Sequence, residues 1–335
     1  HGRGLWILDD ITPLRHLTRD VLDADAAFLP ARPSVRTIPA GLQEFPGDDR
    51  FAGGNPTSVA TITYYLKKRH MFGDLKVEVY DPDGKLVATL PGGRRVGINR
   101  VSWFMRRKPP KVPPAPQLAG RALFGPMVPA GTYTVKLFKG AETYEGRVEV
   151  IPDATLPHSA ADQELQAKTV LELYDMQQEL GYLADLATAA RDRARERVKD
   201  LGKGKLPKDL EAFASSVDAL HKTMVATREG FLTGEEQLRE RVVDLYGAIS
   251  EYGGRPSPAQ LGRLSTLQEE MTRVRASLDA EVKKLDALNA SLKDAGKEPI
   301  VLPTREEFEG REEGSAPAGL VASAPGSLAP LMRTH

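Results

Sequence analysis

Histidine and acidic side chains are the groups most able to carry catalysis or hold a metal, so their spacing bears first on chemistry. No two histidines have the HxH or HxxxH spacing by which one strand or helix holds a metal; they stand at His1, His16, His70, His158, His221 and His335. Asp9 and Asp10 are adjacent. Neighbouring side chains of a strand point to opposite faces, whereas two glycosidase carboxylates must flank one bond in a single cleft. We interpret this pair as the polar end of a strand.

Phosphate-binding and thiol chemistry find equally little support. The segment Gly202–Lys205 is too short for a P-loop and follows a helical pattern instead of a strand. The sequence contains no cysteine, which excludes disulfides, thiolate nucleophiles and zinc–cysteine sites. We therefore expect no catalytic residue, no cofactor and no metal site in this chain.

Charge is unevenly distributed along the chain. Segment 55–152 contains 16 Lys and Arg against 7 Asp and Glu, while the whole chain has 46 of each, so the segment carries +9 and the remainder −9. The candidate basic docking surface within it consists of Arg94, Arg95, Arg100, Arg106, Arg107 and Lys108.

Three interpretations of this basic segment are open: docking onto the acidic helices of the same chain, binding of an anionic glycan or protein, and an ordinary solvated face. We prefer the first among the functional ones, because the complementary charge is already present. A net charge of zero argues against a dedicated nucleic-acid binder.

The elements that must position these groups begin with a short apolar run, Gly4–Asp10, which predicts a buried strand. Such a strand needs partners that an upstream region would supply, and the chain starts without an initiator Met or a signal peptide, so we expect a fragment or a processed product. A short helix is predicted from 13 to 23, so that residues 1–24 form one unit. Segment 25–54 is rich in Pro, Gly and Asp and predicts an extended connector. No apolar run is long enough to span a membrane.

Six segments between residues 55 and 152 have the alternation or the β-branched composition of strands. They are Ser58–Leu66, Leu75–Tyr80, Leu86–Leu90, Ile98–Trp103, Tyr133–Leu137 and Glu142–Ile151. Turn sequences such as Asp81–Gly84 separate them. Short, closely spaced strands joined by turns predict an antiparallel β-sandwich of immunoglobulin type.

A proline-rich segment, Lys108–Pro116, interrupts this set of strands and predicts a stiff polyproline II conformation. Such a segment can be a ligand for an aromatic groove. We favour the alternative, a rigid bridge between two strands that runs along the surface of the sandwich.

The apolar period changes to three and four after Pro157, which predicts helices between residues 158 and 296. The first helix has an apolar seam of Leu173, Met176, Leu180, Leu183, Ala187, Ala190 and Ala194. Gly202–Pro207 and Gly253–Pro258 interrupt the pattern, Thr233 with Glu236 predicts a capping box, and Ser257 is the expected N-cap of the last helix. Two helices would reach about 35 residues, or about 50 Å.

Because helix-breaking turns separate these stripes, we favour an elongated antiparallel bundle over a coiled coil with a partner. Residues 297–335 comprise an acidic stretch, Arg305–Glu313, and an Ala, Gly, Ser and Pro-rich tail that predicts disorder. The predicted fold class is thus a multidomain β + α chain in which an orphan strand precedes the sandwich and the bundle.

The motifs together resemble the C-terminal region of bacterial sortilin-type β-propeller proteins. The opening Gly2–Arg15 is similar to a closing propeller strand of proteins with BNR or Asp-box-like repeats, often labelled glycosyl hydrolases. Gly97–Trp103 and Pro129–Leu137 resemble an immunoglobulin-like domain of the flagellar hook-cap type, although Phe104 follows Trp103 where such domains usually have Asp. Leu245–Ile249 fits the helical tail.

This resemblance implies a secreted or periplasmic protein whose ligand or hydrolase site lies in the propeller, so no active-site residue transfers to this chain. We expect a non-catalytic accessory module that braces or presents the propeller and docks against it and against its own helices. The alternatives are a part of a glycosyl hydrolase or sialidase-like enzyme, and a stand-alone glycan- or surface-binding module that uses Tyr64, Tyr65 and Trp103. Alternation favours a core position for Trp103.

Overall fold

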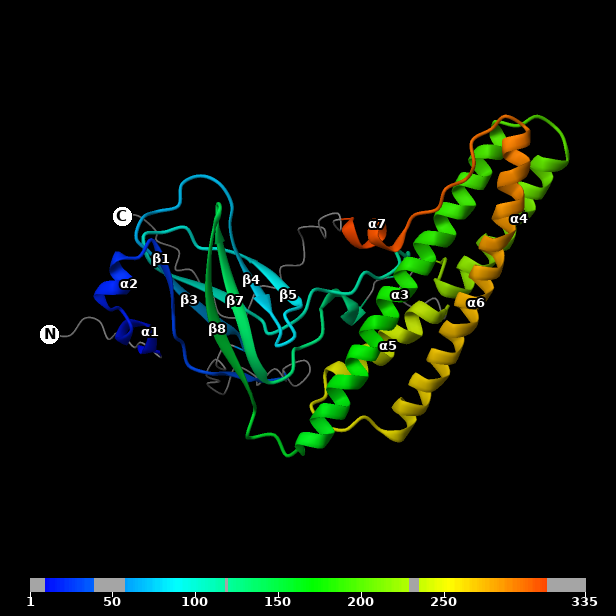
Figure 1. Cartoon of the computed structure of the whole chain (residues 1–335). Helices are drawn as coiled ribbons and strands as arrows, with labels where there is room; N and C mark the ends of the chain where they lie inside the picture. Colours follow the sequence, from blue (N-terminus) through cyan, green and yellow to red (C-terminus); the bar gives the residue numbers. More distant parts are fainter. Residues whose placement is uncertain (1–9, 39–57, 118–119, 229–234, 312–335) are drawn as a thin grey trace, which may run out of the picture.

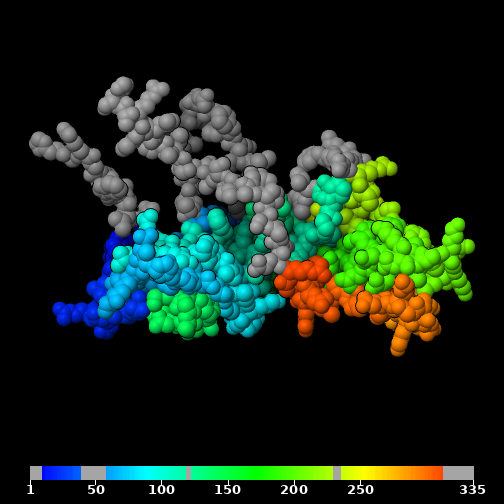
Figure 2. All heavy atoms as spheres, turned by 90° about the horizontal axis from the view of Figure 1, so that it is seen from above, coloured from blue at the N-terminus to red at the C-terminus, as the bar shows by residue number. Residues whose placement is uncertain are grey.

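The computed structural model describes residues 10–38, 58–117, 120–228 and 235–311. Two β-sheets occupy one end of an elongated molecule and long helices occupy the other (Figures 1 and 2). Within the described ranges, no helix combines the length and the apolar character needed to cross a membrane. The predicted strand Gly4–Asp10 lies outside these ranges apart from its last residue, Asp10.

The two sheets contain three and five strands. The first has the order β1-β3-β6 and the second the order β2-β8-β7-β4-β5. The bounds of the strands are β1 Ala26–Leu29, β2 Ser34–Arg36, β3 Ala60–Leu66, β4 Leu75–Tyr80, β5 Leu86–Pro91, β6 Gly97–Trp103, β7 Gly131–Lys139 and β8 Glu142–Pro152. The six predicted strands are thereby confirmed, with ends that differ by at most two residues.

The two sheets share one hydrophobic core, because the alternating apolar residues of both contribute to it. Ile62 and Val101 come from the first sheet, and Val77 and Val135 from the second. Trp103 is 1% exposed and meets the Tyr133 ring edge-on, with the ring centroids 5.1 Å apart. The predicted core position of Trp103 is confirmed.

The sharp turns between strands follow the predicted chemistry. Gly84 adopts a φ of +78° that glycine tolerates best, and the Lys85 backbone N–H donates to the carboxylate of Asp81 at 2.8 Å.

The expected connector, segment 25–54, is wrong in its first part. Strand β1 pairs antiparallel with β3, and strand β2 pairs parallel with β8, so the pairing is not wholly antiparallel. Phe28 packs where Gly146 leaves room, since a Cβ at Gly146 would lie 2.6 Å from the phenyl ring. Strands of three and four residues are too short to show alternation, which explains why periodicity missed them. Residues 39–54 lie outside the described ranges.

The helix expected over 13–23 is two short helices, α1 Thr12–Arg15 and α2 Arg19–Asp23. Thr18 separates them, because its hydroxyl accepts the Val21 backbone N–H at 3.4 Å and so acts as the N-cap of α2.

Four helices after residue 158 share a second core. They are α3 Ala160–Lys199, α4 Lys205–Met224, α5 Leu238–Ser250 and α6 Pro258–Asp294. With 40 and 37 residues, α3 and α6 confirm the prediction of two helices that approach or exceed about 35 residues. The complete apolar seam predicted for the first helix is buried in this core.

Local capping decides where these helices begin and end. Ser257 accepts the Gln260 N–H at 3.2 Å and so confirms the N-cap predicted for α6. Helix α5 begins at Leu238, after the capping box expected at Thr233 and Glu236; Thr233 itself lies outside the described residues. Glu240, three residues after the N-cap Gln237, accepts the Gln237 backbone N–H at 3.2 Å and so stabilises a helix start at Leu238.

Part of the region expected to be an acidic stretch and a tail is ordered. A final short helix, α7 Arg305–Gly310, begins after Thr304 and packs on α3. The predicted disorder of the tail concerns residues outside the described ranges.

Candidate functional site at the junction of sheets and helices

The proline-rich segment joins the sheets to the helices. It leaves β6, crosses to the helices and returns through the short 3₁₀ helix η1, Gly120–Leu123, which lies against α5 (Figure 1). Pro110 and Pro113 are buried. The bridge expected along the sandwich surface is wrong, because the carbonyl and N–H groups of this segment bind helix side chains. Segment 108–117 is called the docking loop below.

A buried arginine of α5 holds the docking loop. The Arg239 guanidinium donates to the Pro113 carbonyl at 2.9 Å and to the Gln117 carbonyl at 3.1 Å. Its third contact is an ion pair with the neighbouring Glu240, 2.6 Å long, and the two side chains are 3% and 8% exposed. Burying a charge is costly unless it is paired and hydrogen-bonded. Arg239 meets both conditions only while the docking loop is in place.

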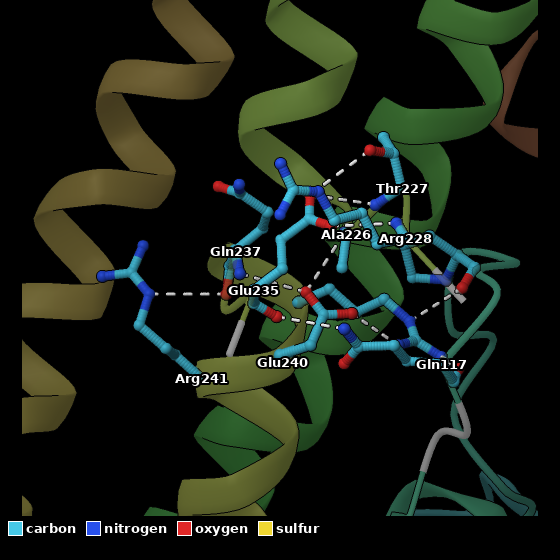
Figure 3. A network of polar contacts seen from close by, with 10 residues as sticks. Gln117, Ala226, Thr227, Arg228, Glu235, Gln237, Glu240 and Arg241 are labelled. Atoms are coloured by element: carbon cyan, nitrogen blue, oxygen red, sulfur yellow. Dashed lines mark hydrogen bonds and ion pairs between the residues drawn. The ribbon is translucent and has the colours of Figure 1, made fainter. Parts of the chain in front are cut away.

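The Glu240 carboxylate is satisfied from the opposite side as well. It accepts the backbone N–H groups of Ala226 and Gln237, each at 3.2 Å (Figure 3). Both the end of α4 and the start of α5 are therefore tied to the acceptor that pairs with Arg239. A substitution of Arg239 should therefore also disturb the hydrogen bonds of Glu240 that connect α4 to α5.

A second carboxylate orders the chain just after α4. Glu235 accepts the backbone N–H groups of Thr227 at 3.1 Å and of Arg228 at 2.9 Å (Figure 3). These hydrogen bonds hold the pKa of Glu235 below its ordinary value, and the one from the Thr227 backbone N–H has the largest effect. The Gln117 amide donates to the Glu235 carbonyl at 3.1 Å, which links the docking loop to the same segment.

The side chain of Lys111 attaches the docking loop to α7. Its ammonium donates to the carbonyls of Phe308, Glu309 and Arg311 at 2.8, 2.8 and 2.7 Å. Carbonyl groups at a helix C-terminus carry partial negative charge and lack partners within the helix, so a cation is favoured there. The Lys111 backbone N–H donates to Gln178 of α3 at 2.9 Å.

Helix α7 is itself attached to α3. Arg305 forms an ion pair with Glu179, and Arg311 forms one with Asp185 at 2.9 Å. The Phe308 ring packs on Tyr182, with the centroids 5.8 Å apart. The docking loop, α7 and α3 thus form one three-part contact.

Gly181 allows the closest approach in this contact. A Cβ at this position of α3 would lie well within the van der Waals contact distance of the Lys111 carbonyl oxygen. Beside it lies a cavity of about 210 Å³, lined by the docking loop, α3, α4 and α7 and including His221. Burial lowers the pKa of His221 below its ordinary value of 6.5, and the nearby Arg191 guanidinium acts in the same direction.

Directly after η1, the Phe124 carbonyl accepts the Tyr246 hydroxyl of α5 at 2.8 Å. Tyr246 is 1% exposed, and burial raises the pKa of its phenol. A hydroxyl that keeps its proton up to high pH is a dependable donor. Together with Arg239, it gives α5 two side-chain donors to backbone carbonyls of the segment between β6 and β7.

The six basic residues predicted to form one docking surface do not share one place. Arg94 and Arg95 precede β6 and Arg106, Arg107 and Lys108 follow it, so the seven residues of the strand separate them by about 20 Å. Arg100 lies within β6 and donates to the Asp10 carbonyl at 3.3 Å.

Two of these arginines are used inside the sheet region. Arg106 donates to the Gly125 carbonyl at 2.9 Å, and Arg107 pairs with Asp81 at 3.2 Å. Docking onto the helices instead uses backbone groups of the docking loop and Lys111. Sequence reasoning missed Arg239, because its burial depends on a loop more than 100 residues away in the chain.

The other candidates for chemistry are dispersed or enclosed. The described histidines, at 16, 70, 158 and 221, lie in different parts of the fold, and no group of three or more potential ligands among the described residues could hold a metal. Asp10 accepts the Thr12 backbone N–H at 2.9 Å, two residues along the chain, and pairs with Arg32 at 3.4 Å.

The three rings proposed for glycan binding are not exposed together. Tyr64 is 0% and Trp103 1% exposed, while Tyr65 is half-buried. A glycan platform built from these three side chains is therefore wrong.

The comparisons with known proteins add no family assignment: neither a protein-family model nor a curated protein matches this chain.

Proposed function

We propose that this chain is a non-catalytic accessory module that braces or presents a β-propeller of the sortilin type. In this proposal the two sheets form an immunoglobulin-like sandwich over about residues 55–152, extended by β1 and β2, and the long helices form an antiparallel bundle over 158–296. The similarity of Gly2–Arg15 and Gly97–Trp103 to that family supports the propeller as the partner.

The observation that carries the bracing role is the buried attachment of the docking loop. The Arg239 charge is compensated by Glu240 and by two loop carbonyls, so detaching the loop would leave a buried cation short of hydrogen bonds. A connection of this kind favours one orientation of the sheets relative to the helices. A module with a defined shape can hold a neighbouring domain in place.

A distance measurement between the two regions tests the brace. The chain has no cysteine, so Ser102→Cys on β6 and Ser265→Cys on α6, both exposed, would give two unique spin-label sites. We expect a narrow distance distribution that becomes broad when Arg239→Met is added. Lys203→Gln, an exposed change at the α3–α4 turn, is the control and should leave it narrow. A broad distribution before any change at Arg239 would refute the brace.

The propeller partner is tested separately. We expect the reading frame upstream of the His1 codon to encode propeller repeats, and the propeller to melt at a higher temperature when it is expressed with this module than without it. A frame without such repeats, or a propeller of equal stability in both forms, would remove the propeller from the proposal and leave the brace untouched.

A further inference from the structure

Two neighbouring loops of the sheet region expose apolar side chains. The loop between β3 and β4, residues 67–74, arches out from the sheets (Figure 1), and its Phe72 and Met71 are 85% and 59% exposed. The loop between β5 and β6, residues 92–96, exposes 63% of Val96. The His70 backbone N–H donates to the Arg94 carbonyl at 3.1 Å and joins the loops. Together, residues 67–74 and 92–96 are called the tip.

Cationic side chains accompany the exposed apolar residues of the tip. It contains one carboxylate, Asp74, and five cations, which are Lys67, Lys68, Arg69, Arg94 and Arg95. All five are exposed. Lys67 lies 3.6 Å from Asp23, and the neighbouring Asp25 pairs with Lys139 at 2.8 Å. The two loops of the tip thus keep an excess of positive charge.

The scaffold fixes these loops in position. The Tyr64 hydroxyl donates to the Gly93 carbonyl at 2.6 Å. The Asn99 amide donates to the Arg95 carbonyl at 2.7 Å and accepts the Arg95 N–H at 3.1 Å. Tyr64 and Asn99 are buried, so core side chains hold the backbone from which the exposed residues project. Gly73, with a φ of +82°, makes the turn directly after Phe72.

We propose that the tip binds the surface of an anionic lipid bilayer. Phe72, Met71 and Val96 enter the boundary between headgroups and acyl chains, while the tip cations contact the anionic headgroups. Exposed apolar side chains next to cations match both layers of that boundary. This surface is independent of the proposed propeller and its brace.

A bilayer fits the tip better than a protein or a nucleic acid does. Three projecting side chains on two loops offer far less than the area of about 800 Å² per partner that a stable protein interface needs. Nucleic acid would use the cations and leave Phe72 in water, because phosphate contacts dominate its affinity. A bilayer engages both kinds of side chain without a shaped counterpart.

Vesicle co-sedimentation with the full chain tests the proposal. We expect binding to phosphatidylcholine vesicles that contain about 30% phosphatidylglycerol, and much weaker binding to phosphatidylcholine alone. Met71→Ser with Phe72→Ser should weaken binding about tenfold or more at unchanged charge. Arg94→Gln with Arg95→Gln should also weaken it about tenfold or more.

Matched controls remove the same chemistry elsewhere. Phe104→Ser takes away a 66% exposed ring beyond the opposite end of β6, and Lys203→Gln with Lys205→Gln takes away two exposed charges at the α3–α4 turn. Both controls should bind as the unchanged chain does. In Phe72→Trp, we expect a blue shift of fluorescence and quenching by brominated acyl chains. Because Phe72 is exposed, these variants test binding without disturbing the core.

Three results would overturn the proposal. The first is a chain that does not sediment with anionic vesicles. The second is binding that survives the loss of Met71 and Phe72, which would be adsorption by charge alone. The third is binding to heparin or polyglutamate that depends on Phe72 while vesicles are ignored, which would identify an acidic polymer as the partner.

Discussion

At the scale of single residues, the junction depends on a few buried polar groups whose partners come from distant parts of the chain. Arg239 has a carboxylate partner beside it in α5 and carbonyl partners in the docking loop. A buried ion pair contributes little net stability, yet removing one member leaves the other charge uncompensated. The two loop carbonyls complete the hydrogen bonding of Arg239 only when the docking loop is in place, so burial of the pair favours the docked arrangement.

Arg239→Met should lower the free energy of unfolding by about 3–5 kcal/mol, because Glu240 then stays buried without its cation. Adding Glu240→Gln removes that charge and keeps an acceptor for the Ala226 and Gln237 N–H groups, so the double variant should be more stable than the single one. Urea unfolding measures both. Equal stability of the single and double variants would show that the charge of Glu240 is not the cause.

His221 gives the chain a defined response to acid. Its pKa in the folded chain lies below 6.5, so below about pH 6.5 the unfolded chain binds a proton that the folded chain resists. The contribution of neutral His221 to the free energy of unfolding is therefore fully present above about pH 6.5. It is lost as the pH falls toward the pKa of His221 in the folded chain. Arg191 and Lys222 oppose protonation of His221, and Asp218 favours it.

His221→Gln should lose less stability than the unchanged chain between pH 7 and about pH 5. Unfolding free energies measured by urea at several pH values give both slopes. Carboxylate titrations are common to the two proteins and cancel in the difference. Parallel slopes would contradict the role of His221.

At the scale of elements, close approach of backbones decides how the docking loop sits on α3. Gly181 is costly in the middle of a helix, because glycine is about 1 kcal/mol less favourable there than alanine. Its place is explained by the Lys111 carbonyl, which occupies the space of a Cβ. Gly262 of α6 offers a matched comparison, since nothing lies within 4 Å of its Cβ position.

Gly181→Ala should displace the docking loop although alanine favours the helix, because the clash is with backbone rather than with a flexible side chain. Hydrogen exchange should show faster exchange of the Lys111 N–H, which donates to Gln178. Gly262→Ala should instead raise the unfolding free energy by about 1 kcal/mol and leave exchange in the loop unchanged. Unchanged exchange in Gly181→Ala would contradict the close docking.

At the scale of the whole molecule, the sheets and the helices have separate cores that are joined at the junction. Two cores alone would allow two unfolding events. The docking loop, which belongs to the sheet region by sequence and to the helices by contact, connects them. Through Lys111 it also includes α7, so residues near 308 influence a loop about 200 positions earlier.

Calorimetry should therefore show one cooperative transition for the unchanged chain. Arg239→Met combined with Gly181→Ala should separate it into two, as the sheets and helices lose their coupling. Gly262→Ala serves as the control and should keep a single transition. Two transitions in the unchanged chain would show that the junction does not couple the cores.

The sequence alone determined the elements whose signal is local. Alternation in Leu75–Tyr80 and the three-and-four spacing from Leu173 to Ala194 reflect which face is buried, and the structure confirms both. Ser257 identified the start of α6, because a side-chain cap acts over three residues. Such information needs no knowledge of distant parts of the chain.

Only the tertiary structure decided the junction. Lys108–Pro116 looked like a surface bridge, because polyproline II has no internal hydrogen bonds and its sequence does not say where its carbonyls find donors. The local sequence around Arg239 gives no sign of its burial, because that burial is produced by a loop far away in the chain. The tip shows the same division. The sequence contains the cations at 67–69, but only the folded chain joins their loop to the loop of Arg94 and Val96, through the His70–Arg94 hydrogen bond and the buried Tyr64.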